Sequence, residues 1–110
     1  MIYNQFDIVF TPFPFTDKNA AKKRPAIVLN NRNYQLKTNH LILAMITSAK
    51  NSKWENDLQI KEIEPTGLKS ASVIRYKIFS LDERVVLKKL GTISENDQKQ
   101  VKENLLKLLE

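Results

Sequence analysis

The chain has 110 residues, of which 18 are lysine or arginine and 12 are aspartate or glutamate, so its net charge is +6 at pH 7. Its 42% hydrophobic share is too high for a disordered chain, yet no apolar run approaches the roughly 20 residues that cross a bilayer. Cysteine is absent, which excludes disulfides and thiolate chemistry, and the single histidine, His40, disfavours a metal site. The first residues lack the pattern of a secretory signal. We therefore expect one cytoplasmic domain spanning residues 1–110, without a metal or other cofactor.

Positive charge is concentrated in one third of the chain. Between Asp17 and Glu55 there are eight lysines and arginines and no acid, whereas the remaining ten bases and twelve acids give −2. Amide and hydroxyl side chains are interleaved with these bases, together with Tyr34 and Trp54, a mixture suited to phosphates and stacked bases. This basic segment predicts a surface that faces a polyanion. The alternative is a set of solvated lysines on loops.

The first half of the chain predicts three strands. Residues 5–10 are apolar and β-branched, and Pro12 and Pro14 end that strand because proline cannot donate to a ladder. A polar loop follows. The continuous apolar runs 25–29 and 41–46 predict buried central strands, and the asparagine-rich residues 30–33 predict a turn between them.

The second half predicts further strands and one helix. The expected strands are short and turn-bounded, and they cover residues 58–61, 72–79, 84–87 and 90–93, with a turn at 65–67. Ser94 is placed as the N-cap of a helix that carries Val101, Leu105, Leu108 and Leu109 at helical spacing. The fold class is therefore mainly β, a barrel or sandwich with a C-terminal amphipathic helix.

The order of these segments resembles one protein family. The matching pieces are an opening strand with an acid, Arg24-Pro25 before Ala-Ile-Val-Leu, the strand ending in Ile46-Thr47-Ser48, Gly67-Leu68, Ser72 to Arg75, Phe79 to Asp82, and Leu90 to Ile93. Together they resemble the MazF/PemK toxin family along essentially the whole chain. The run from Phe13 to Asp17 resembles one branch of that family.

This resemblance implies an SH3-like small barrel with a C-terminal helix, assembled as a homodimer. It also implies a metal-independent endoribonuclease that cleaves single-stranded RNA, as the toxin of a type II toxin–antitoxin pair. The implied partner is a cognate antitoxin whose acidic, otherwise disordered tail occupies the RNA groove, which suits the basic segment. We expect no contact with a membrane.

The resemblance places catalytic residues at three points of the chain. Arg24 matches the arginine of the Arg-Pro junction, and its planar fork suits two phosphate oxygens, so we expect it to stabilise transition-state charge. Thr47 and Ser48 match a polar pair that donates to the phosphate or orients the 2′-hydroxyl. The plain alternatives are a surface ion pair for Arg24 and a turn cap for Thr47 and Ser48. Arg75 matches an arginine that some members use at the active site.

The general base is the point where this chain departs from the family. Some members have an acid two residues beyond the arginine that Arg75 matches, whereas this chain has Lys77 in a stretch one residue shorter. Asp7, the acid of the first strand, is the substitute candidate, and Asp57 is a second. The alternative for Asp7 is a salt bridge to Arg24 or Arg75. His40 is set aside because seven residues at about 3.3 Å each place it roughly 23 Å from Thr47.

The expected RNA-binding residues are bases and aromatic side chains of the basic segment and the preceding loop, namely Lys22, Lys23, Lys50, Lys53, Trp54 and Phe15. Trp54 stacks a nucleobase in this interpretation and plugs the barrel in the alternative. Phe15 forms a groove wall or part of the core. A rival interpretation of the whole chain is a catalytically inactive basic barrel that binds a nucleic acid or an acidic peptide.

Overall fold

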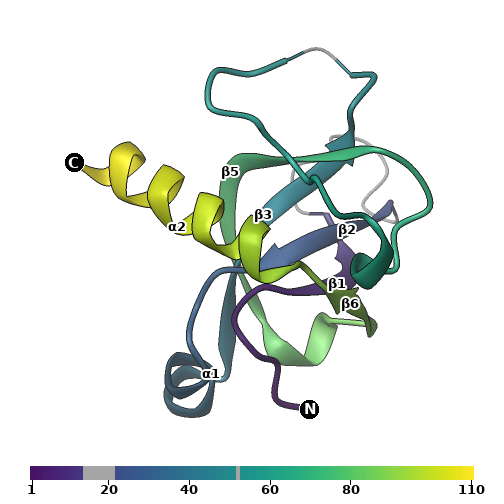
Figure 1. Cartoon of the computed structure of the whole chain (residues 1–110). Helices are drawn as coiled ribbons and strands as arrows, with labels where there is room; N and C mark the ends of the chain where they lie inside the picture. The colour runs from purple at the N-terminus through teal and green to yellow at the C-terminus, as the bar shows by residue number, and fades with distance from the viewer. Residues whose placement is uncertain (14–21, 52) are drawn as a thin grey trace.

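The computed structural model describes residues 1–13, 22–51 and 53–110. Their main feature is one six-stranded antiparallel sheet in the order β4-β5-β3-β2-β1-β6, which curls into a half-barrel (Figure 1). Its strands are β1 (Asp7–Pro12), β2 (Lys23–Val28), β3 (His40–Ser48), β4 (Leu58–Gln59), β5 (Ser72–Asp82) and β6 (Lys88–Thr92). The mainly β fold that the sequence predicts is confirmed.

Both faces of the sheet are buried. Along β2, Ile27 belongs to one hydrophobic cluster with Ile8 and Ala44, whereas Val28 belongs to a second cluster with Leu43. Successive strand residues point to opposite faces, so a strand buried on both sides carries an uninterrupted apolar run. This is why the central runs of the sequence do not alternate, and it confirms both as central strands.

The first strand begins two residues later than predicted and ends with Pro12 as its last member. Phe6 has a φ of 75°, in the left-handed region, so the chain turns before Asp7. Pro12 still belongs to the ladder because it closes the pairing of β1 with Lys23 of β2.

The turn predicted at residues 30–33 is wrong, because this segment leads into a helix, α1 (Arg32–Thr38). Asn31 is its N-cap and accepts a hydrogen bond from the backbone N–H of Tyr34, and Asn39 ends it with a φ of 58°. Gln35 is fully buried and donates to the carbonyl of Met1 and to Glu83. The helix is therefore fixed by caps and one buried amide rather than by an apolar stripe.

Three shorter segments also differ from expectation. Residues 84–87 do not form a strand, because Asp82 accepts from the backbone N–H of Arg84 and starts the 3-10 helix η2 (Glu83–Val85). The predicted turn at residues 65–67 is the 3-10 helix η1 (Glu64–Thr66), which ends at Gly67 with a φ of 74°. The strand expected over 58–61 is reduced to the two residues of β4.

The C-terminal helix is confirmed as α2 (Glu95–Leu109), with Ser94 as its N-cap. Val101 is buried in the first cluster and Leu105 packs against it. Leu106 and Leu109, near the helix end, are 63% and 77% exposed, and this end projects away from the sheet (Figure 1). In the part of the chain that the structure describes, no helix has the length and apolar character of a membrane span.

Candidate functional site

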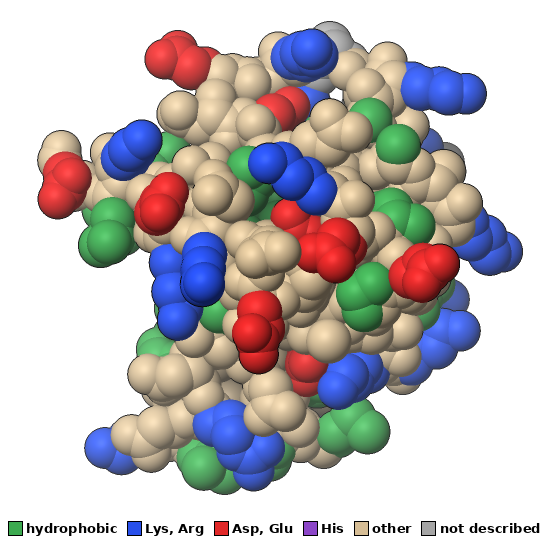
Figure 2. All heavy atoms as spheres, viewed as in Figure 1, with side chains coloured by type: hydrophobic (Ala, Val, Ile, Leu, Met, Phe, Trp, Pro, Cys, Tyr) green, Lys and Arg blue, Asp and Glu red, His purple; other side chains and the backbone are tan. Residues whose placement is uncertain are grey.

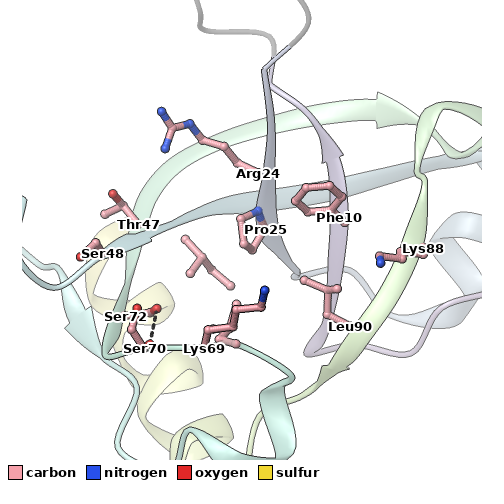
Figure 3. A pocket seen from close by; sticks show the side chains of 12 residues that line it. Phe10, Arg24, Pro25, Thr47, Ser48, Lys69, Ser70, Ser72, Lys88 and Leu90 are labelled. Carbon is pink, nitrogen blue, oxygen red and sulfur yellow. Dashed lines mark hydrogen bonds between the residues drawn. The ribbon is translucent and has the colours of Figure 1, made fainter.

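A pocket of about 410 Å³ opens at the end of the sheet where β2 begins and β3 ends. Because these strands are antiparallel, with Ala26 opposite Met45, the first residues of β2 lie beside the last residues of β3. Arg24, Thr47 and Ser48 all line this pocket (Figure 3). The structure thus brings together three of the residues that the sequence predicts as catalytic.

The pocket wall combines cations and hydroxyls with an apolar floor. Its polar side chains include Lys69, Ser70, Ser72 and Lys88, from the segment before β5, from β5 and from β6. Its apolar members are Phe10, Pro25, Ile46, Leu68 and Leu90. None of the described lining residues is a carboxylate or a histidine. Such a wall suits an anionic group attached to an apolar or aromatic body.

The two hydroxyls of β3 differ in their contacts. Thr47 is nearly buried, and its Oγ1 accepts from Nδ2 of Asn51 at 2.6 Å, so its own proton remains available to an acceptor in the pocket. Ser48 Oγ accepts from the backbone N–H of Lys50 at 3.2 Å. The turn cap that was the alternative interpretation is therefore present at Ser48, although this residue also lines the pocket.

Arg75 does not line this pocket and instead contacts Asp57 and Trp54. Its guanidinium donates twice to Asp57, with Nε–Oδ1 3.2 Å and Nη2–Oδ2 2.9 Å, and both side chains are 9% exposed. It also lies 5.2 Å from the ring centroid of Trp54, and Lys77 Nζ lies 5.8 Å from the same ring. Trp54 is 47% exposed, so it does not plug the barrel.

The irregular pairing of β5 explains this arrangement. Opposite Ala44 and Met45 of β3 stand Ile78 and Arg75, so two extra residues of β5 bulge out between them. Next to the bulge, Asn51, Lys53, Trp54, Asp57 and Gln59 line a second hollow of about 270 Å³. Lys53 and Trp54, two of the predicted RNA-binding residues, therefore meet around one concave surface.

The ionisation of Asp57 bears on its candidacy as general base. Burial raises the pKa of this carboxyl, but the hydrogen bonds from Arg75 and from the backbone of Trp54 outweigh burial and hold the pKa below its ordinary value. A carboxylate with a lowered pKa that is already bonded to a guanidinium is a weak proton acceptor. Asp57 is better described as the residue that orients Arg75.

Asp7 lies far from the pocket. It is the first residue of β1 and pairs with Thr92, whereas Arg24 pairs with Thr11 near the other end of that strand. Its carboxylate accepts from the backbone N–H of Asn4 at 2.8 Å and forms a salt bridge with Lys89 at 3.3 Å. The expected ion pair is thus present with Lys89 instead of Arg24 or Arg75. The structure does not bring Asp7 to the other predicted catalytic residues.

The basic segment does not form one continuous patch. Lys22 and Lys23 precede or begin β2, and Lys50 and Lys53 follow β3, so these four lie at the pocket end of the sheet. The cations of α1 lie at the opposite end, after β2 and before β3. In Figure 2 basic side chains lie along the upper and right-hand edges of one face, and also at its centre, left and lower edge, with acidic side chains interspersed among them. Phe15 lies outside the described residues.

Sequence reasoning missed Lys69 and Lys88. The cations expected from the sequence lie between Asp17 and Glu55, whereas Lys69 precedes β5 and Lys88 begins β6, and the order of the strands in the sheet brings both to the same pocket. The available signal was Lys69-Ser70 beside Gly67, a basic and hydroxyl pair next to a turn. His40 begins β3, at the end of the strand away from Thr47, as expected. Within the described ranges, no group of three or more His, Cys, Asp or Glu side chains is placed to hold a metal ion.

The curled antiparallel sheet, the helix packed on one of its faces and the cationic pocket at its end define a small half-barrel protein with a site suited to a polyanion. The sequence profile of the PemK-like, MazF-like toxins of type II toxin–antitoxin systems matches residues 4–109. The chain belongs to this family. Comparison with curated protein sequences finds no significant match.

Solved structures of the same fold cover almost the whole chain. MazF from Deinococcus radiodurans is 21% identical, with a TM-score of 0.76 over 99% of this chain and 97% of that one. An endoribonuclease in complex with its cognate antitoxin, from a mycobacterial species, is 11% identical, with a TM-score of 0.75 over 98% and 93%. The D. radiodurans MazE–MazF complex is 20% identical, with a TM-score of 0.74 over 99% and 96%. These likenesses confirm the small toxin barrel with its C-terminal helix.

Proposed function

We propose that this toxin is a metal-independent endoribonuclease that cleaves single-stranded RNA and thereby inhibits translation and growth. The observation that carries the proposal is the convergence of Arg24, Thr47 and Ser48 on one pocket, from two strands, although Arg24 and Thr47 are 23 residues apart in the chain. Membership of the toxin family and the likeness to a mycobacterial endoribonuclease support it.

In the proposed reaction the 2′-hydroxyl of RNA attacks the adjacent phosphorus and leaves a 2′,3′-cyclic phosphate and a 5′-hydroxyl. Arg24 binds two phosphate oxygens and stabilises the charge that develops on them. The Thr47 hydroxyl, already an acceptor from Asn51, donates to the phosphate, and Ser48 lies beside it. No metal is needed for these roles.

The group formed by Trp54, Asp57 and Arg75 binds RNA in this proposal. The exposed ring of Trp54 stacks a nucleobase, while Lys53 beside it and Lys50, Lys22 and Lys23 nearby contact phosphates. Arg75 serves here too, because Asp57 fixes its guanidinium against the Trp54 ring. Its expected catalytic role is replaced by one in binding, since Arg75 does not line the pocket of Arg24.

A cognate antitoxin and a second copy of the chain are the proposed protein partners. The solved relatives described above include a MazE–MazF complex and an endoribonuclease with its antitoxin. An acidic, disordered tail suits the cations that gather at the pocket end of the sheet. The exposed leucines at the end of α2 support a homodimer, because association would bury them.

One observation favours a second candidate function, an inactive module that binds RNA or an acidic peptide. The described pocket lining holds no carboxylate or histidine that would act as a base, and Lys77 stands where some members have an acid. The same cations would then hold a polyanion without cutting it.

An RNA digest in excess EDTA separates these functions. We expect the purified protein to cleave a long single-stranded RNA under these conditions and to leave 2′,3′-cyclic phosphate ends. Retention of RNA without cleavage would establish the binding module, and neither binding nor cleavage would leave the acidic peptide as the ligand. Activity that required Mg²⁺ or Mn²⁺ would contradict the mechanism.

A further inference from the structure

Lys69 enters the pocket from a segment that no family motif assigns to the site. Arg24 comes from β2, whereas Lys69 comes from the segment that leads into β5, on the other side of the pocket (Figure 3). In that view the Lys69 ammonium lies between the two hydroxyls of β3 and Leu90, while Lys88 lies beyond Leu90. Lys69 therefore lines the same pocket as Arg24 and Thr47, from the opposite wall, and adds a second cation to it.

The backbone that carries Lys69 is tightly held. Both glycines of the chain lie at one crossing, where a Cβ on Gly67 would overlap the carbonyl oxygen of Leu90 and a Cβ on Gly91 would overlap that of Pro65. The hydroxyl of the fully buried Thr66 accepts from the backbone N–H of Leu68 at 3.0 Å.

The residues on either side of Lys69 are held as well. Leu68 packs against the first hydrophobic cluster, and the carbonyl of Ser70 accepts from Ser72 Oγ at 2.9 Å. Packing and hydrogen bonds thus fix the backbone at Lys69, whose side chain points into the pocket. Catalytic groups need such a fixed position.

The chemistry of the described lining singles out the lysines as proton donors. Guanidinium groups do not give up a proton in proteins, and serine and threonine hydroxyls are far weaker acids than an ammonium group. The 5′-oxygen leaves RNA as an alkoxide and needs a proton as its bond to phosphorus breaks. Of the two lysines, Figure 3 draws Lys69 between the hydroxyls of β3 and Leu90, and Lys88 beyond Leu90, so we assign the role to Lys69.

We propose that Lys69 is a further catalytic residue, the general acid that protonates the leaving 5′-oxygen; this rests on the proposed endoribonuclease function. The bond from O2′ to phosphorus forms as the bond from phosphorus to O5′ breaks, and the electron pair of the broken bond stays on O5′. O5′ takes its proton from the Lys69 ammonium, the 2′-hydroxyl proton passes to a water molecule, and Lys69 is reprotonated from solvent.

The test uses a substrate whose leaving group needs no proton. After the cleavage site is mapped with wild-type protein, the 5′-oxygen at that site is replaced by sulfur in a synthetic oligoribonucleotide. Single-turnover rates at saturating RNA are then compared for the wild type, Lys69→Arg, Lys69→Gln and Arg24→Ala. Lys99→Arg, on the exposed surface of α2, is the matched control and should cleave at the wild-type rate. Far-UV circular dichroism establishes that each variant is folded.

We expect Lys69→Arg, which keeps the charge and loses the acid, to cleave ordinary RNA on the order of a hundredfold more slowly. On the sulfur-containing substrate this variant should approach the wild-type rate, whereas Arg24→Ala should remain slow. A normal rate for Lys69→Arg, or a defect that the sulfur substrate does not relieve, would overturn the role of Lys69. If the wild type itself cleaves no RNA, the proposed function fails instead.

Discussion

Arg24 and Arg75 illustrate how two arginines of one chain acquire different roles from their surroundings. Arg75 is nearly buried and is already bonded twice to Asp57, so its charge is largely committed within the protein. Arg24 is half-buried on the wall of a pocket whose described lining contains no acid. A guanidinium at such a place is suited to bind a phosphate from outside.

Replacing Arg24 by alanine should therefore affect the reaction far more than the fold. Loss of a transition-state donor costs about 2.7–4 kcal/mol in the barrier, or a hundredfold or more in rate. The measurement is the single-turnover rate at saturating RNA, with binding followed by the fluorescence of Trp54, the only tryptophan. Lys22→Ala and Lys23→Ala should instead weaken binding and flatten its salt dependence while sparing the chemical step. A near-wild-type rate for Arg24→Ala would remove the centre of the proposal.

The Asp57–Arg75 pair should make stability depend on pH in the acidic range. Because the pKa of Asp57 is lower in the folded protein than in the unfolded chain, the pair stabilises the fold above the unfolded pKa, about 3.9. That stability is lost as the pH falls through the lower folded pKa. We expect Asp57→Asn to lower the free energy of unfolding at pH 7 by about 1–3 kcal/mol and to remove this acid-dependent component.

Urea unfolding at a series of pH values from neutral to acidic measures both effects. Asp82→Asn is the matched control, because Asp82 also binds an arginine twice, but the side chain of that arginine, Arg84, is 84% exposed. Solvent screens such a pair, so its loss should be the smaller. Equal losses in the two variants would show that burial of the Asp57 pair has no special effect.

At the scale of the elements, sequence patterns that span a whole strand or helix predict the structure well. Elements that depend on a single side-chain contact are not predicted. The runs in β2 and β3 and the spacing in α2 are long enough to indicate their elements. In contrast, α1 has one buried side chain, Gln35, whose partners lie far away in the sequence, and no window of the chain contains that information. The strand expected after Asp82 is lost to a single side-chain cap.

The same contrast explains which residues of the candidate site the sequence predicts. Arg24, Thr47 and Ser48 stand at the ends of strands, where a motif and a strand pattern coincide, so the sequence predicts them. Lys69 and Lys88 reach the pocket only through the order of the strands in the sheet. The pairing of Asp7 with Lys89 depends on how β1 and β6 are aligned, and that alignment includes a bulge after Ile8.

The glycine crossing offers a test of how η1 and β6 support the pocket. Gly91→Ala would force its Cβ against the backbone of Pro65 and Thr66, and such overpacking costs about 1–3 kcal/mol. Gly67→Ala should cost more, because a left-handed φ of 74° adds backbone strain to a similar overlap. Thermal unfolding measures both. Because Lys69 follows this crossing in the chain, the rate of RNA cleavage should fall even at temperatures where the variants remain folded. Unchanged melting temperatures would contradict the close contact between the two glycines and the facing backbone.

At the scale of the whole molecule, the exposed end of α2 is the feature that most needs a partner. We expect sedimentation equilibrium at micromolar concentration to give twice the chain mass of 12.8 kDa. The double variant Leu106→Glu/Leu109→Glu should shift this mass towards the monomer. Leu36→Glu, at a leucine of α1 that is 56% exposed, is the control and should leave the mass unchanged. A monomeric wild type would contradict the homodimer.

The burial of both sheet faces also determines which backbone segments can unfold locally. β3 pairs along its length with β5, supports both hydrophobic clusters and carries Thr47 and Ser48 at its end. β4, in contrast, contributes two residues, and Trp54 precedes it in an exposed segment. Amide hydrogens of Leu43 and Ala44 should thus exchange with deuterium only on global unfolding, while those around Trp54 exchange through local fluctuations. The two hydroxyls assigned to the chemical step, Thr47 and Ser48, then end a strand whose amides exchange slowly, whereas the ring assigned to nucleobases lies in a segment whose amides exchange through local fluctuations.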